Sequence, residues 1–137
     1  MAEFSEKPTE VATAVAYDPE KQKFLLLKRN FETDIHPGKW NFPGGRIENE
    51  QPVDAALREL EEETGLKGEM IRSAEPFTID TEDGKFKVHP FLILVDEEPE
   101  LNQEHLDSQW IEPEELDDFE TVDGLRKDLK RVGAVDG

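Results

Sequence analysis

The feature that most constrains the fold of this chain is a stretch over residues 44–66, in which two glycines precede a short helical segment. Pro52 suits the first helical turn, where its missing N–H is not needed. Gly65 suits the position just after the last turn, where the backbone often takes a left-handed conformation. The stretch therefore predicts a helix over residues 52–64 that follows a tight glycine-rich turn.

This helix has one apolar and one acidic face. The residues expected to pack on a sheet recur at helical spacing: Val53, Ala56, Leu57, Leu60 and Thr64. Glu59, Glu62 and Glu63 are related by i+3 and i+4 and share the other face, so their carboxylates are expected to be exposed and to repel one another. A divalent cation among them would offset that repulsion. The alternative interpretation is an ordinary solvated acidic face.

Composition sets limits on the function. The chain has 34 acidic and 16 basic residues, a net charge of −18, and no cysteine. Thiol nucleophiles, thiolate metal sites and disulfides are therefore excluded, and nucleic acids and anionic membranes would be repelled. Most of these charges suggest solubility or a salty environment. The polar N-terminus and the lack of a long apolar run favour a cytoplasmic protein.

Apolar runs and turns predict the remaining elements. Expected strands cover residues 11–17, 24–28, 40–42, 69–80, 86–95 and 109–111, and expected helical segments cover residues 52–64, 113–116 and 122–132. The first two strands form a hairpin, and a turn at Asp83-Gly84 joins the pair 69–80 and 86–95. The irregular alternation of strands and helices favours an α+β fold. Residues 1–137 form a single domain, with residues 1–9 as a flexible leader.

The same patterns predict two loops and the inward face of the last helix. Residues 96–107 are expected to form an acidic loop, and residues 30–39 a polar loop. In the last helix, Leu125, Leu129 and Val132 recur at helical spacing and are expected to face inward.

The glycine turn and the helix together resemble the signature of the Nudix hydrolases, which is written GX5EX7REUXEEXGU with U an apolar residue. Every fixed position is filled: Gly44, Glu50, Arg58, Glu59, Leu60, Glu62, Glu63, Gly65 and Leu66. Such a strictly spaced motif is far more specific than a lone glycine-rich loop. The resemblance covers residues 10–132 and implies the family's α/β/α sandwich, with a mixed β-sheet between helices.

One departure from the family pattern lies in the turn. Family members usually open the motif with the second glycine of a GG pair, but here the count works only from Gly44. One residue, typically a glycine, is missing between Gly45 and Glu50. We therefore expect a tighter loop before the helix and an altered position for Glu48 and Glu50.

The resemblance implies a divalent-metal site for which Mg²⁺ is the expected ion and Mn²⁺ the alternative. Mg²⁺ prefers oxygen ligands, which glutamates supply. Glu62 and Glu63 would be the central ligands, Glu59 a further ligand or the base that orients water, and the Gly44 carbonyl a last ligand. Arg58 can brace the acidic cluster through paired hydrogen bonds.

Other candidates lie outside the motif. Nudix proteins often carry a further glutamate in the loop that corresponds to residues 96–107, as an extra metal ligand or general base. Glu104 is the choice here, with Glu97, Glu98 and Glu100 as competitors, and its neighbour His105 is interpreted as a loop residue.

Substrate-binding candidates precede the motif. Arg29 ends a predicted strand and could hold a phosphate, although an ordinary strand-end charge is the alternative. Trp40 or Phe42 could stack on a base, while core packing is expected for at least one of them. His89, in the middle of a strand, is interpreted as structural.

The expected activity is metal-dependent hydrolysis of a phosphoanhydride bond in a nucleoside diphosphate linked to another group. Chain length and the KWNFPGG run favour a MutT-like nucleoside triphosphate pyrophosphatase. An ADP-ribose or other nucleotide-sugar pyrophosphatase is the alternative, although a proline often found after the motif in that group is absent. A dinucleoside polyphosphate hydrolase is disfavoured because Tyr17 is the only tyrosine.

A different class is a non-catalytic Nudix fold that senses nucleotides. It is disfavoured because such proteins usually lose motif glutamates and this chain keeps them all. The expected partner is a small nucleotide, with no nucleic acid and no membrane. A homodimer is allowed because dimers are common in the family, and no discrete feature supports a basic protein partner.

Overall fold

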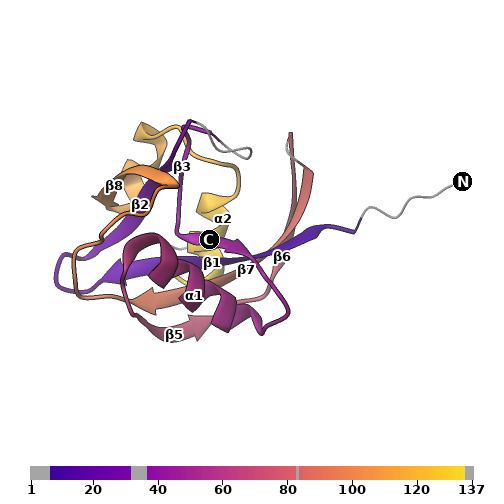
Figure 1. The fold of residues 1–137 in the computed structure, drawn as a ribbon, viewed down its shortest axis with the longest axis horizontal. Coiled ribbons are helices and arrows are strands. Elements are labelled where there is room, and N and C mark those ends of the chain that lie inside the picture. The colour runs from indigo at the N-terminus through magenta and orange to yellow at the C-terminus, as the bar shows by residue number, and fades with distance from the viewer. Residues whose placement is uncertain (1–6, 32–36, 83, 135–137) are drawn as a thin grey trace, which may run out of the picture.

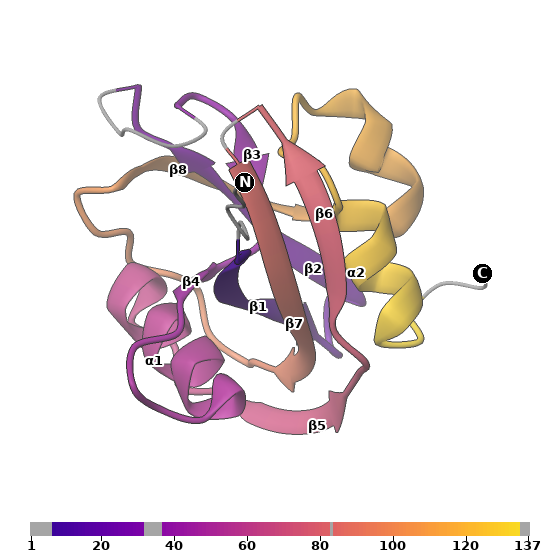
Figure 2. The same cartoon turned by 90° about the vertical axis from the view of Figure 1, so that its right-hand side faces the viewer.

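A mixed β-sheet with a helix on either face forms the centre of the molecule, as Figures 1 and 2 show. The computed structural model describes residues 7–31, 37–82 and 84–134. In chain order the elements are β1 (Thr9–Asp18), β2 (Lys23–Arg29), β3 (Trp40–Asn41), β4 (Gly44–Arg46), α1 (Pro52–Thr64), β5 (Glu69–Ser73), β6 (Phe77–Thr81), β7 (Gly84–Leu94), β8 (His105–Ile111), the 3₁₀ helix η1 (Pro113–Asp118) and α2 (Leu125–Arg131).

Strand β1 organises the sheet. It forms the expected antiparallel hairpin with β2 and a parallel ladder with β7, in which Thr9 lies opposite Phe86 and Tyr17 opposite Leu94. The strand order is β3-β2-β1-β7-β5, with β4 paired to β1, β6 to β7 and β8 to β2. Because parallel and antiparallel pairs share one sheet, the predicted α+β sandwich with a mixed sheet is confirmed.

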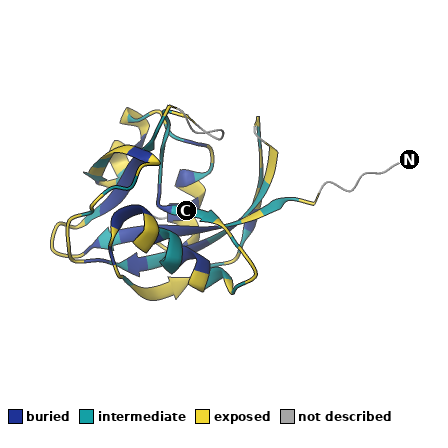
Figure 3. Ribbon diagram, in the orientation of Figure 1, coloured by how far each residue is buried: buried dark blue, intermediate teal, exposed yellow. Residues whose placement is uncertain are grey.

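Alternating side chains send the sheet's apolar residues into two cores. Leu25 and Leu27 of β2 face the α1 side, whereas Phe24 and Leu26 face the α2 side, as the period of two in a strand requires. The α1 core contains Ala12, Ala14, Ala16, Ala55, Ala56, Leu60 and Ile93. The α2 core contains Val15, Phe42, Ile111, Val122, Leu125, Leu129 and Val132. The buried residues thus lie on both faces of the strands, between the two helices (Figure 3).

The predicted strand over residues 69–80 is two strands in the structure. Strands β5 and β6 both pair antiparallel with β7, β5 along its second half and β6 along its first. Pro76 lies between β5 and β6, and Pro90 lies in β7 between the two paired segments. Neither proline can donate a backbone hydrogen bond, so the ladder is interrupted there. Of the predicted turn at Asp83-Gly84, Asp83 lies outside the described residues.

Other boundaries also differ from the expectation. Strand β8 begins at His105 and pairs with β2 as far as Ile111, so the acidic loop is shorter than predicted and the last strand longer. Helix α2 begins only after Gly124, whose φ of 99° places it in the left-handed region. Strand β1 already includes Thr9, so the expected leader over residues 1–9 is wrong at that residue; residues 1–6 lie outside the described chain.

Candidate active site

Helix α1 presents the motif glutamates toward the glycine turn. Its apolar residues pack on the sheet, and Gly65 ends it in the left-handed conformation at φ 75°, with its N–H donating to the Glu61 carbonyl (2.8 Å). Since Glu63 follows Leu60 by three residues, it shares the buried side of the helix. Its residue exposure is only 3%, so the expectation of an exposed Glu63 is wrong.

Glu63 is held against the turn by a backbone donor. The N–H of Gly44 donates to Glu63 Oε1 at 3.1 Å. Burial raises the pKa of the Glu63 carboxyl well above 4.5, the neighbouring Glu59 and Glu104 raise it further, and the Gly44 hydrogen bond opposes them. Such a group is costly to ionise unless a cation approaches it.

Glu59 lies beside Glu63 and packs on the second glycine of the turn. A Cβ added to Gly45 would overlap the Glu59 carboxylate, which explains why this position carries no side chain. Burial raises the pKa of Glu59, and Arg58 acts in the opposite direction. Two acidic groups with raised pKa values therefore lie side by side at the helix–turn junction.

Glu104 and His105 approach Glu63 from the start of β8. One ligand atom from each of these three residues lies within 4.8 Å of the other two. Asn102 Oδ1 lies 3.2 Å from His105 Nδ1, and the backbone N–H of Glu104 donates to the same oxygen (3.1 Å). Burial, followed by Arg29, lowers the pKa of His105 to about 4, so the imidazole is neutral near pH 7. His105 is thus a buried strand residue, and its assignment to a loop is wrong.

Arg58 links the shortened loop to the helix. Its guanidinium bonds Glu50 through Nε (3.1 and 3.2 Å) and Nη2 (2.6 Å), and Nη2 also donates to the Arg46 carbonyl (3.1 Å). This contact lowers the pKa of Glu50. Asn49, in the shortened loop, takes the left-handed conformation, with φ 53°. The Glu50–Arg58 pair then joins the end of this loop to the helix.

Glu62 occupies a different position from the other motif glutamates. Its side chain is 54% exposed and lies 3.3 Å from Arg58 Nη1. Among the described residues, the group of closely spaced metal-ligating atoms includes Glu63 but neither Glu59 nor Glu62. The structure therefore brings Glu59, Glu63 and Glu104 to one place and leaves Glu62 at its edge with Arg58.

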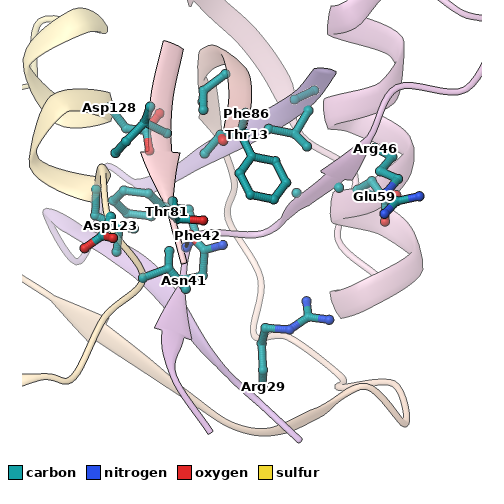
Figure 4. A pocket seen from close by; sticks show the side chains of 18 of the residues that line it. Thr13, Arg29, Asn41, Phe42, Arg46, Glu59, Thr81, Phe86, Asp123 and Asp128 are labelled. Carbon is teal, nitrogen blue, oxygen red and sulfur yellow. Dashed lines mark hydrogen bonds between the residues drawn. The ribbon is translucent and has the colours of Figure 1, made fainter. Parts of the chain in front are cut away.

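A cavity of about 340 Å³ opens beside this cluster (Figure 4). Arg29, Gly44, Glu59, Glu63 and Glu104 line one part of it, together with the previously proposed Phe42. Trp40 is not among its lining residues and instead packs edge-to-face on Phe119, with ring centroids 5.2 Å apart. Of the two aromatic candidates, Phe42 therefore faces the cavity and Trp40 supports the α2 core.

The other part of the cavity extends over β6 and the start of α2. Its lining there is largely apolar and includes Phe77, Ile79, Val122 and Leu125, but it also contains the buried Asp128. Sequence reasoning missed Asp128. The available signal was its place between Leu125 and Leu129, on the inward face of the last helix.

The donor set around Glu63 fits a divalent cation. Carboxylate oxygens suit hard ions such as Mg²⁺, and a neutral imidazole suits Mn²⁺ and related ions. A cation would also compensate the repulsion that raises the pKa of Glu63. Glu63, Glu104 and His105 are thus the described residues whose ligand atoms lie close enough together to hold one.

Comparison with known proteins identifies the family. The NUDIX domain model matches residues 7–132. A MutT protein from Methanosarcina mazei superposes with a TM-score of 0.82 at 27% identity, over 96% of this chain and 97% of the other. The chain therefore belongs to the Nudix family, and it is a hydrolase.

Two curated relatives refine the comparison. The nucleoside triphosphatase NudI of Escherichia coli is 27% identical over 126 residues, which are 82% of this chain and 89% of NudI. The m7GpppN-mRNA hydrolase NUDT17 of Xenopus laevis is 41% identical over 66 residues, 47% of this chain but only 22% of that protein. No helix among the described residues is long and apolar enough to cross a membrane.

Proposed function

We propose that this protein is a divalent-metal-dependent pyrophosphatase of the MutT type that hydrolyses a phosphoanhydride bond of a nucleoside triphosphate. One observation carries the proposal: the buried Glu63 carboxyl faces Glu59 and Glu104 at one end of a cavity sized for a small molecule. Three acidic groups so placed are stable together as anions only beside a cation. The similarity to a MutT protein and to a nucleoside triphosphatase supports this substrate class.

Glu59, Glu63 and Glu104 would hold the cation, with His105 or the Gly44 carbonyl as further donors and Glu62 at the margin. A bound Mg²⁺ or Mn²⁺ supplies charge that polarises a phosphoryl oxygen and lowers the pKa of water. Glu104, or Glu59 as the alternative, would act as the general base in place of a ligand role, because both line the cavity. Arg29, which lines the same part of the cavity, would bind a phosphate oxygen.

Arg58 has a positioning role in this proposal. It bonds Glu50, Glu59 and Glu62 and so holds the loop and two motif glutamates in fixed relation. Because the guanidinium is fully engaged with these carboxylates, it orients the site rather than the substrate.

A substrate panel tests the proposal. The protein is incubated with Mg²⁺ or Mn²⁺ and, separately, with each ribo- and deoxyribonucleoside triphosphate, ADP-ribose and a dinucleoside polyphosphate, and the released products are quantified. Release of a nucleoside monophosphate and pyrophosphate from a triphosphate is expected, and excess EDTA should abolish it. Turnover of ADP-ribose alone would redirect the assignment to nucleotide-sugar hydrolysis. Absence of turnover from every compound would contradict an enzymatic role.

A further inference from the structure

The segment between β7 and β8 is tied by its backbone to the last turn of α1. The N–H of Glu100 donates to the Thr64 carbonyl at 2.7 Å, and the N–H of Asn102 donates to the Glu63 carbonyl at 3.2 Å. Carbonyls in the last turn of a helix have no partner within the helix, so these two donors satisfy groups that the helix leaves open. Asn102 is therefore held next to the backbone of Glu63.

The side-chain oxygen of Asn102 meets two nitrogen atoms at the start of β8. The backbone N–H of Glu104 donates to Asn102 Oδ1 at 3.1 Å, and His105 Nδ1 lies 3.2 Å from the same oxygen. The Glu104 carbonyl in turn accepts a hydrogen bond from the N–H of Asn30 at 2.8 Å. Asn102 and the residue that follows Arg29 therefore hold the backbone of Glu104 from two sides.

These contacts determine which nitrogen of His105 carries a hydrogen. A backbone N–H can only donate, so the Asn102 atom that the Glu104 N–H meets is the amide oxygen and not the amide nitrogen. An amide oxygen can only accept, so the His105 Nδ1 atom that faces it must carry a hydrogen. Nε2 is then the nitrogen whose lone pair is available to a cation.

We propose that Asn102 is a positioning residue that holds His105 in the tautomer with the hydrogen on Nδ1, so that Nε2 can bind a divalent cation together with Glu63 and Glu104. One ligand atom from each of these three residues lies within 4.8 Å of the other two. A hydrogen bond to the second nitrogen of a metal-binding histidine fixes the orientation of the ring, and its loss lowers metal affinity by about 10- to 100-fold. The proposal rests on the proposed metal-dependent hydrolysis and adds a nitrogen donor to the carboxylates of the site.

A nitrogen donor also affects which cation the site prefers. Mg²⁺ favours oxygen ligands, whereas imidazole suits first-row transition ions such as Co²⁺. If Asn102 acts through His105, its substitution should affect the binding of Co²⁺ more than the binding of Mg²⁺. A general disturbance of the loop would weaken both cations alike.

Nitrogen NMR of the metal-free protein at neutral pH tests the tautomer. Long-range proton–nitrogen correlation spectra distinguish the ring nitrogen that carries a hydrogen from the one with a lone pair. The chain has three histidines, and His105→Gln identifies the His105 signals by their loss. We expect the hydrogen on Nδ1 in the parent and in Asn102→Asp, whose carboxylate accepts from the same two donors, but a mixture of tautomers in Asn102→Leu. A hydrogen on Nε2 in the parent would overturn the proposal.

Calorimetric titration with Co²⁺ or Mg²⁺ alone tests the role in binding. We expect Asn102→Leu to weaken Co²⁺ binding about tenfold or more and to weaken Mg²⁺ binding less, whereas Asn102→Asp should bind Co²⁺ at least as tightly as the parent. Gln103→Leu is the matched control, because this neighbouring side chain is exposed and its bond to Asn30 uses only its carbonyl. Unchanged Co²⁺ binding in Asn102→Leu, or an equal loss for both cations, would contradict the assigned role.

Thermal unfolding in EDTA separates binding from folding. Asn102→Leu and the smaller Asn102→Ala should both remain folded, because the backbone hydrogen bond to the Glu63 carbonyl does not depend on the side chain. Loss of the fold in both variants would assign Asn102 to stability and overturn the proposal. A parent protein that shows the expected tautomer and Co²⁺ binding but hydrolyses no nucleotide would support the role of Asn102 and contradict the proposed function.

Discussion

Glu63 combines two properties that rarely occur together, because it is a motif carboxylate and also one of the most buried residues of α1. The Gly44 N–H donates a hydrogen bond to its carboxyl group, while Glu59 and Glu104 repel its ionised form. The fold therefore keeps a destabilising carboxyl group at a position where it can bind a ligand. An isosteric substitution of Glu63 can separate the effect of its charge from the effect of its packing.

Glu63→Gln should lower kcat on the order of 10²-fold or more, because an amide cannot supply the anionic oxygen that the cation needs. The Gly44 hydrogen bond can be kept by the amide oxygen, and a source of charge repulsion is removed, so the melting temperature should hold or rise. Steady-state kinetics and thermal unfolding measure the two effects. Glu61→Gln, on the exposed side of the same helix, is the matched control and should be neutral. Normal turnover by Glu63→Gln would remove this residue from the site.

In the metal-free protein, the contribution of Glu63 to stability should fall as the pH rises above about 4.5. In the unfolded chain a glutamate titrates near 4.5, whereas burial and Glu59 hold the pKa of folded Glu63 well above that value. The folded state therefore binds more protons between the two pKa values, and its stability falls as the pH rises through that window. Urea unfolding in EDTA across this range measures the slope. Glu63→Gln should reduce it, and an identical slope in the variant would contradict this origin.

The sequence predicted which types of residue form the site, but it did not predict the burial and neighbours of all of them. The spacing from Gly44 to Leu66 predicted which carboxylates belong to α1, since that spacing is local. It failed on the exposure of Glu63, because burial there depends on how α1 packs on the sheet, including strand β1, which is distant in sequence. It selected Glu104 among four acids only by resemblance, and it missed Asp128, whose burial depends on the packing of α2 against the sheet.

At the scale of elements, the loop between β4 and α1 depends on one guanidinium. Arg58 makes a fork to Glu50 and reaches the Arg46 carbonyl, whereas a lysine offers a single point of contact. Loop and helix are therefore coupled through geometry as well as charge. The pair is partly shielded, with side-chain exposures of 29% and 19%.

Arg58→Lys should destabilise the fold by about 1 kcal/mol or more and should lower kcat by letting Glu59 and the loop shift. Chemical denaturation and kinetics measure both. The control is Arg126→Lys, which alters the exposed Arg126–Asp117 pair (3.0 Å) and should cost less than about 0.5 kcal/mol. Equal costs for the two substitutions would show that the fork has no special role.

The elements themselves were largely predictable from periodicity and caps. The bounds of α1 follow from Pro52 and Gly65, and the hairpin of β1 and β2 from a local turn. The division between β5 and β6 was not predicted, because it depends on Pro76 and on Pro90, which lies in the partner strand. The late start of α2 depends on the left-handed Gly124, which the helical pattern alone does not reveal.

At the scale of the whole molecule, a net charge of −18 must work against compactness. We expect the melting temperature to rise by several degrees between about 0.1 M and about 1 M KCl, as the Debye length falls from about 10 Å to about 3 Å. Differential scanning calorimetry at pH 7 measures this effect. Near pH 4.4, the isoelectric point, the same salt series should have little influence. A salt effect of equal size at both pH values would point to specific ion binding instead.

The parallel ladder between β1 and β7 also has a consequence for how the chain is made. Strand β1 leaves the ribosome early, but its neighbour β7 is synthesised only after α1, β5 and β6. Until then the central sheet cannot close, and Val15 and the apolar side chains around it have no permanent cover. Glu104 emerges later still, and α2 follows it. The cluster around Glu63 can therefore assemble only after the start of β8 has been synthesised.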